Sequence, residues 1–105
     1  MLAFHRRTDS LASLVDTIAV LSPDSIVLHV GQSSQILGSL QLEARRRTGE
    51  VVNGAGMDVR VEDLTIAMPE QQGLTGLQVG QTRVVIRIIG NRAVPPSYIP
   101  VVVIP

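Results

Sequence analysis

The stretch GNRAVPPSYIPVVVIP, residues 90–105, decides how this chain can fold. Its four prolines exclude a helix, because each one removes a backbone donor and constrains the residue before it. The segment must therefore run extended. Its aliphatic side chains would stand in water unless another surface covered them, and burying each one is worth roughly 1.5–3 kcal/mol. We expect residues 90–105 to form an extended apolar tail that docks on its own domain or on a neighbouring subunit.

The composition allows one domain with an aliphatic core. Of the 105 residues, 45% are hydrophobic and only 2% are aromatic, so Val, Ile and Leu must build the interior. Nucleic-acid modules that stack bases need aromatic platforms, which this chain lacks. A formal net charge of zero gives no general attraction to nucleic acid or anionic membranes. The lack of cysteine excludes disulfides, thiolate metal sites and cysteine nucleophiles.

The N-terminal residues do not have the pattern of a secretory signal peptide. Basic residues near the start are followed by polar residues and not by an uninterrupted apolar run. No stretch approaches the roughly 18 apolar residues of a membrane span. We expect a protein made in the cytoplasm with no membrane partner, whose residues 1–8 form an N-terminal arm.

Residues 9–22 have apolar residues at helical spacing. Asp9 or Ser10 can cap a helix, and Pro23 disfavours helical geometry at Ser22. The pattern therefore predicts a helix over 9–22. The apolar stripe of this helix consists of Leu11, Leu14, Val15, Ile18 and Leu21.

Residues 25–89 alternate between apolar and polar side chains in several short runs, as strands do. Runs at 25–30 and 35–44 predict an antiparallel hairpin. Met57–Met68 predicts a third strand with a bulge near Glu62, and Thr82–Ile89 is the strongest strand. A long polar loop, 45–56, lies between the second and third runs. The expected fold is mainly β, a small antiparallel β-barrel or sandwich with an N-terminal helix and an extended C-terminal tail.

The sequence offers no convincing catalytic, metal or cofactor site. His5 and His29 have no second ligand nearby, and a metal site needs several. Gly54-Ala55-Gly56 lacks the Lys-Ser/Thr of a phosphate-binding loop. We therefore expect a non-enzyme without a cofactor. The acidic residues of the third strand are better explained as an exposed, salt-bridged face: Asp58, Glu62 and Asp63 around Arg60.

Two groups of residues are candidates for contact with partners. Arg45-Arg46-Arg47 could touch DNA phosphates or an acidic partner, although Glu43 and Glu50 beside it also fit a solvated loop. Arg83 and Arg87 could pair with acidic residues of a neighbouring subunit, or could simply be exposed. The predicted subunit or partner interface comprises Val94, Pro95, Pro96, Tyr98, Ile99, Val101, Val103 and Ile104 of the tail, together with Arg83 and Arg87.

The order of these features resembles the small head–tail joining proteins of tailed bacteriophages, the lambda-like attachment or stopper group. The resemblance rests on the strand–turn–strand unit, the long loop, the step Leu77-Gln78-Val79-Gly80-Gln81 and the late segment 90–96. Gln81 stands where that group usually has aspartate. The resemblance implies a non-enzymatic virion component in a homo-oligomeric ring, sixfold or twelvefold, that joins the portal–adaptor complex to the tail and helps to retain the packaged DNA. DNA would pass nearby without sequence-specific binding, and the loop with Arg45, Arg46 and Arg47 would face a partner or the channel.

Two alternatives remain from the sequence. One is a monomeric cellular β-barrel module that binds a peptide or protein through an exposed edge strand, with the tail folded onto its own sheet. The other is a phage tail-tube or capsid-decoration component, which would also form a ring or lattice.

Overall fold

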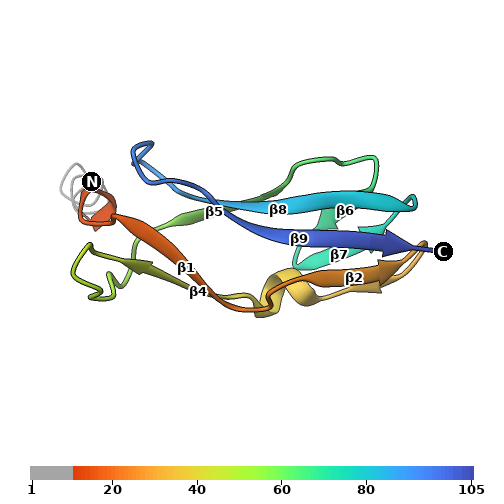
Figure 1. Cartoon of the computed structure of the whole chain (residues 1–105), viewed down its shortest axis with the longest axis horizontal. Coiled ribbons are helices and arrows are strands. Elements are labelled where there is room, and N and C mark those ends of the chain that lie inside the picture. Colours follow the sequence, from red (N-terminus) through yellow and green to blue (C-terminus); the bar gives the residue numbers. More distant parts are fainter. Residues whose placement is uncertain (1–10) are drawn as a thin grey trace.

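The computed structural model describes residues 11–105, which form a β-sandwich (Figure 1). The predicted arm at residues 1–8 and His5 lie outside the described residues. One helical turn at residues 11–13 precedes the first strand. The elements that follow are β1 (Thr17–Ser22), β2 (Ile26–His29), β3 (Ser33–Ser34), the 3-10 helix η1 (Ile36–Ser39), β4 (Gln41–Arg45), β5 (Met57–Val61), β6 (Ala67–Glu70), β7 (Gly73–Gly76), β8 (Gly80–Ile88) and β9 (Ser97–Ile104).

One layer of the sandwich is a four-stranded sheet with the order β2-β9-β8-β5. The other layer consists of two smaller sheets, β1-β4 and β3-β7-β6. Since β3 and β4 are separated only by η1 and a residue on each side of it, they can be counted as two halves of one strand. The second layer then has the order β1, β3/β4, β7, β6, and the first contains β5, β8 and β9 as neighbours. This is the arrangement of an immunoglobulin-type sandwich.

The tail predicted from the sequence is a strand of the protein's own sheet. Ser97–Ile104 forms β9, which pairs antiparallel with β8 and parallel with β2. Ile99, Val101 and Val103 are at most 1% exposed, so they belong to the core. Their assignment to a subunit interface was therefore wrong. The sequence suggested a tail outside the sheet because Thr82–Ile89 already reads as a complete strand. The alternation within one strand does not reveal which strands pair with it on either side.

The predicted helix over 9–22 is wrong beyond its first turn. Hydrogen bonds from the Leu14 and Val15 amides close one turn, and the chain then extends into β1. Two members of the predicted stripe, Leu14 and Leu21, are exposed. The β-branched residues Thr17, Ile18 and Val20 favour a strand, and β4 supplies the pairing partner. The strand β1 ends at Ser22, the residue at which the helix was predicted to end.

The predicted hairpin between 25–30 and 35–44 is also wrong. β2 pairs parallel with β9, β4 pairs antiparallel with β1, and η1 interrupts the second run. The bulge predicted near Glu62 is instead the end of β5, where the chain crosses to the other layer and begins β6. Local alternation identified the faces of these strands but not their partners. The strongest predicted strand, 82–89, is confirmed as β8.

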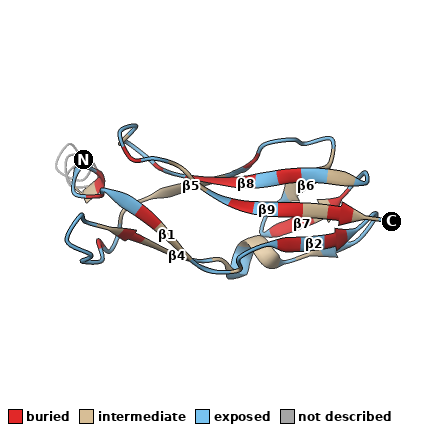
Figure 2. Cartoon of the chain, viewed as in Figure 1, coloured by how far each residue is buried: buried red, intermediate tan, exposed pale blue. Residues whose placement is uncertain are grey.

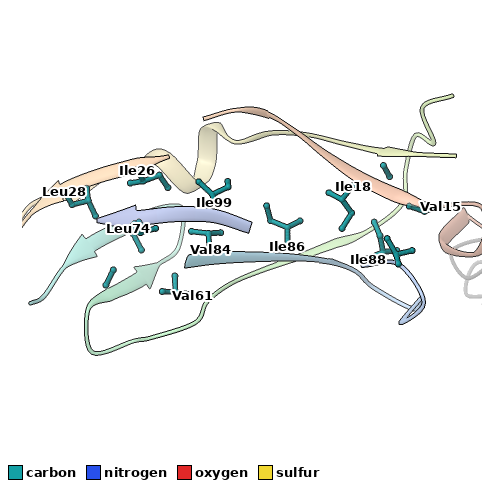
Figure 3. Packing of buried hydrophobic residues seen from close by; sticks show 14 of the residues in the cluster. Val15, Ile18, Ile26, Leu28, Val61, Leu74, Val84, Ile86, Ile88 and Ile99 are labelled. Carbon is teal, nitrogen blue, oxygen red and sulfur yellow. The ribbon is translucent and has the colours of Figure 1, made fainter. Parts of the chain in front are cut away.

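Buried and more exposed residues alternate along β2 and β9, and along β8 except at Val85, which is buried although it lies on the outer face (Figure 2). The inner face of the large sheet is dry. Side chains from both layers meet between the sheets (Figure 3). The core is aliphatic, as the composition predicts. Its largest fully buried side chains are Leu28, Leu74, Val84, Ile86, Ile99, Val101 and Val103.

Candidate interaction face

The outer face of the four-stranded sheet gathers some of the polar residues that the sequence singles out. Alternation along β8 buries Val84 and Ile86 and leaves Arg83 and Arg87 exposed. On β9, Tyr98 lies opposite Val85 and faces the same way as these arginines. Arg83, Arg87 and Tyr98 are therefore on one surface, whereas Ile99, Val101 and Val103 of the tail face the core.

An ion pair and an aromatic contact order part of this face. The Arg83 Nε and Nη2 atoms donate to Glu62 Oε2 at 3.1 and 2.7 Å. The same guanidinium lies over the Tyr98 ring, 4.0 Å from its centroid. The side chains of Arg83 and Glu62 are each about half exposed, and surface ion pairs of this kind contribute about 0–1 kcal/mol to the free energy of unfolding. The acidic partner of Arg83 is thus supplied by its own chain.

A depression of about 490 Å³ lies beside this pair. Arg60 Nε donates to Asp58 Oδ2 at 2.7 Å within the same strand. Arg87 is directly opposite Asp58 in the β5–β8 register, yet among residues 11–105 it has no ion pair or hydrogen bond through its side chain. Its guanidinium is available to bind a carboxylate or phosphate group. The depression is lined by Asp58, Arg60, Val61, Glu62, Val85, Arg87 and Tyr98.

The other predicted interface residues are dispersed. Val94 is buried, Pro95 is exposed and Pro96 is partly buried in the β8–β9 connection. Ile104, at the end of β9, is partly buried beside His29 of β2. A partner-binding role for the exposed members of the set stays a prediction.

The arginine loop forms contacts within the chain. Arg45 pairs with Glu43, and its Nε atom is buried without a hydrogen-bond partner. Arg46 lies 3.9 Å from Glu50. The backbone amide of Arg47 donates to Asp16 Oδ2 at 2.6 Å. The first two contacts involve the glutamates that flank the arginines in the sequence, and the third involves Asp16 before β1. A partner role for Arg45, Arg46 and Arg47 stays a prediction.

The remaining candidates have structural surroundings. His29 Nδ1 lies 2.9 Å from the Pro105 carbonyl oxygen, which joins the ends of β2 and β9. The Asp63 carboxylate accepts hydrogen bonds from the hydroxyl and backbone amide of Thr65, and these hold its pKa below the ordinary value. Within residues 11–105 the structure gathers no group of three or more His, Asp or Glu side chains that could hold a metal ion. No helix in that range is long and apolar enough to cross a membrane.

Sequence reasoning missed the role of two polar side chains that join distant segments. Asn91, in the β8–β9 connection, donates to the Ala12 carbonyl oxygen at 2.8 Å. The Ser97 hydroxyl, at the start of β9, donates to the Ile18 carbonyl oxygen at 2.8 Å. Both contacts tie the N-terminal segment to the connection and strand that follow β8. The only sequence signal was an asparagine after Gly90, which by itself indicates a turn.

Comparison with known proteins identifies the fold but not a family. Models of protein families give no match to the sequence, and no characterised protein matches it. Solved structures do match. Domains 4 and 5 of the S-layer protein SbsC superpose with a TM-score of 0.60 and 18% identity, over 87% of this chain and 53% of theirs. Domains 5–6 give 0.61 and 19%, over 86% and 44%. Domains 4–9 give 0.59 and 19%, over 86% and 14%.

These neighbours correct the function expected from the sequence. These solved structures are S-layer domains and not components of a phage neck, so the assignment as a head–tail connector was wrong. The sequence features behind that assignment have other roles here. The apolar tail is a core strand, and segment 90–96 connects β8 to β9. At this identity the likeness establishes the fold alone, and the chain spans about half or less of the length of the solved chains.

Proposed function

We propose that this chain is a structural module that spans distance in a row of domains, within an assembly of the surface-layer kind. Its task in this proposal is mechanical and architectural, and no catalysis is part of it. The observation that carries the proposal is the position of the two ends of the described chain.

The described chain enters and leaves the sandwich at opposite ends of its long axis. The helical turn at residues 11–13, before β1, lies at one end, and the C-terminus after β9 lies at the other (Figure 1). The principal extents are 48 × 31 × 21 Å, so the separation follows the longest dimension. A module with this geometry extends a row when it is joined to others, whereas a module with adjacent ends forms a branch.

The solved neighbours support the same arrangement. The chain covers about half of a two-domain SbsC fragment and about a seventh of a six-domain fragment. Both fractions correspond to a single domain of a series. The neighbours are described as S-layer or surface layer proteins, which supports placing the proposed assembly at a cell surface.

Small-angle X-ray scattering on two covalently joined copies tests this proposal. A short linker between the C-terminus of one copy and the N-terminus of the next should nearly double the maximum dimension of a single copy. A control pair with a long Gly/Ser linker should sample shorter separations as well, because such linkers behave as flexible coils. A short-linker pair whose maximum dimension hardly exceeds that of one copy would contradict a serial arrangement.

A further inference from the structure

We propose that the parallel pair β2–β9 is the element that bears tension applied along the long axis of the domain. This inference rests on the proposed function, because a module in a row transmits load between its two ends. It concerns a different property, however, namely the direction in which one set of hydrogen bonds is loaded.

The topology connects each of these two strands to a different end of the described chain. β2 follows β1 near the start of the described chain, and β9 ends at Ile104 beside Pro105. The two strands run in the same direction, side by side (Figure 1). Pulling residue 11 and Pro105 apart therefore draws β2 backwards and β9 forwards along a common axis. The hydrogen bonds between them are loaded in shear.

Shear loads the whole pair at once. The register runs without interruption from Ile26 opposite Val101 to His29 opposite Ile104. Beyond it, the Val30 amide donates to the Ile104 carbonyl oxygen at 2.9 Å. Sliding the strands must break these contacts together, whereas peeling from one end breaks them one after another. The force needed for sliding is consequently the larger.

The inner face of the pair is dry and fixed to the core. Ile26 and Leu28 of β2, and Val101 and Val103 of β9, are at most 5% exposed. Sliding β2 along β9 by one residue would turn these side chains toward solvent, because successive residues of a strand face opposite sides. The apolar contacts therefore resist the same displacement as the hydrogen bonds.

The strands before the pair are coupled to it. β1 pairs with β4 in an antiparallel register that shifts between Val20 and Ser22. The hydroxyl of Ser97 bonds the Ile18 carbonyl oxygen, so β1 is also joined to the start of β9. If β1 separates, the load passes directly to β2. A decisive test should therefore bypass β1.

The test pulls the same strands in two directions. The chain has no cysteine, so handles can be attached at introduced pairs in the full-length protein. Ser25→Cys with Pro105→Cys loads β2–β9 in shear without involving β1. Ser25→Cys with Arg83→Cys pulls across the sheet, at right angles to the strands. Arg83 of β8 lies opposite Pro100 of β9, and the next residue, Val101, pairs with Ile26, which follows Ser25. All three positions are exposed.

We expect the rupture force measured with optical tweezers to be several-fold higher for the shear pair than for the crossing pair at the same pulling speed. Equal forces in the two directions would overturn the proposal. Equilibrium denaturation of both cysteine variants checks that they fold alike. The result is independent of the scattering experiment, because a domain with directional strength could still fail to line up in a row.

A second variant separates the backbone bonds from side-chain effects. In the shear geometry, Val30→Pro removes the amide that donates to Ile104 and should lower the rupture force. Val27→Ala alters an exposed side chain of β2, 59% accessible, and should leave the force unchanged. An unchanged force for Val30→Pro would contradict the assigned role of that bond. If Val30→Pro does not fold, the comparison of directions still decides the proposal.

Discussion

The side-chain amide of Asn91 donates a 2.8 Å hydrogen bond to the carbonyl oxygen of Ala12, 79 residues earlier in the chain. The same nitrogen lies 3.4 Å from the Val15 carbonyl oxygen, and Asn91 Oδ1 accepts from the Ala93 amide. One partly buried side chain thus joins the helical turn before β1 to the β8–β9 connection. It gives the Ala12 carbonyl oxygen a second donor beside the Val15 amide, and it also approaches the Val15 carbonyl oxygen at the end of that turn.

Asn91→Ala should lower the free energy of unfolding by about 0.5–1.5 kcal/mol, because it removes the long-range hydrogen bond to the Ala12 carbonyl oxygen, which then keeps only the bond from the Val15 amide. Chemical denaturation measures this loss. Asn91→Asp keeps the acceptor for the Ala93 amide but loses the donor to Ala12, so a similar loss in both variants would assign the effect to the long-range bond. Arg92→Ala, an exposed neighbour, should change stability by no more than about 0.5 kcal/mol. An equal loss at Arg92 would argue against a specific role for Asn91.

Alternate residues of β9 should differ sharply in their contribution to stability. Ile99 is fully buried, and Ile99→Ala should cost about 2–5 kcal/mol through lost burial and the cavity left behind. Val102 faces outward on the same strand and is only partly buried, so Val102→Ala should cost much less. Denaturant midpoints compare the two. Similar midpoints would mean that β9 does not lie in the sheet as the structure places it.

Gly76→Ala should destabilise the domain because the new methyl group would lie 2.7 Å from the His29 carbonyl oxygen and 3.0 Å from a Val103 methyl. The neighbouring backbone is held in place, since the Gly31 amide donates to the Gly76 carbonyl oxygen at 2.8 Å. Gly56→Ala is the matched control, because its methyl group would lie 3.5 Å from an Ile89 methyl, an ordinary contact. Thermal unfolding should show a clear drop in Tm for Gly76→Ala alone. Comparable Tm values would show that β7 can move away from β2.

The Arg83–Tyr98 contact should be weak and specific. A double-mutant cycle of Arg83→Ala and Tyr98→Ala should give a coupling free energy of about 0.5–1 kcal/mol, as expected for an exposed cation–π pair. The contribution of the Arg83–Glu62 ion pair to the free energy of unfolding should fall as salt is added, because exposed charges are screened. A coupling free energy of zero at low salt would mean that the stacked arrangement is not populated in solution.

The carboxyl group of Asp63 should titrate below its ordinary pKa. The Thr65 hydroxyl is the main cause and the Thr65 amide the second, so Thr65→Ala should raise the pKa of Asp63 toward its usual value. Because the folded-state pKa is the lower one, the contribution of this group to stability is present above the unfolded-state pKa and is lost as pH falls through the folded-state value. NMR titration of the Asp63 side chain measures both variants. An identical pKa in the two proteins would contradict the assigned cause.

The sequence predicts the faces of strands more reliably than their partners. The alternation of β8 and the apolar character of β9 were readable because each pattern lies within nine residues. The partner of β2 was not, since Ile26 pairs with Val101, 75 positions later, and no local signal encodes that distance. The helix predicted over 9–22 failed for a similar reason. Its apolar spacing suits a helix, but pairing with β4 determines the outcome at Thr17–Ser22.

The outer face was only partly predictable. Alternation along β8 placed Arg83 and Arg87 together, which the structure confirms. It could not show that Glu62 would reach Arg83 or that Tyr98 would lie under its guanidinium, because those contacts depend on which strands flank β8. Asn91 was not recognised, since its partner Ala12 is remote in sequence.

The parallel pairing of β2 with β9 also has a consequence for the way the chain folds. The four-stranded sheet cannot close until β9 meets β2, and proteins dominated by such remote pairings fold in milliseconds to seconds, while those rich in local contacts fold far faster. Until then, Ile26 and Leu28 have no strand to cover them along that edge. During synthesis, β2 leaves the ribosome about 75 residues before its partner, because Val101 follows Ile26 by that interval. At a synthesis rate of about 5–20 residues per second, this strand waits several seconds with an unpaired edge.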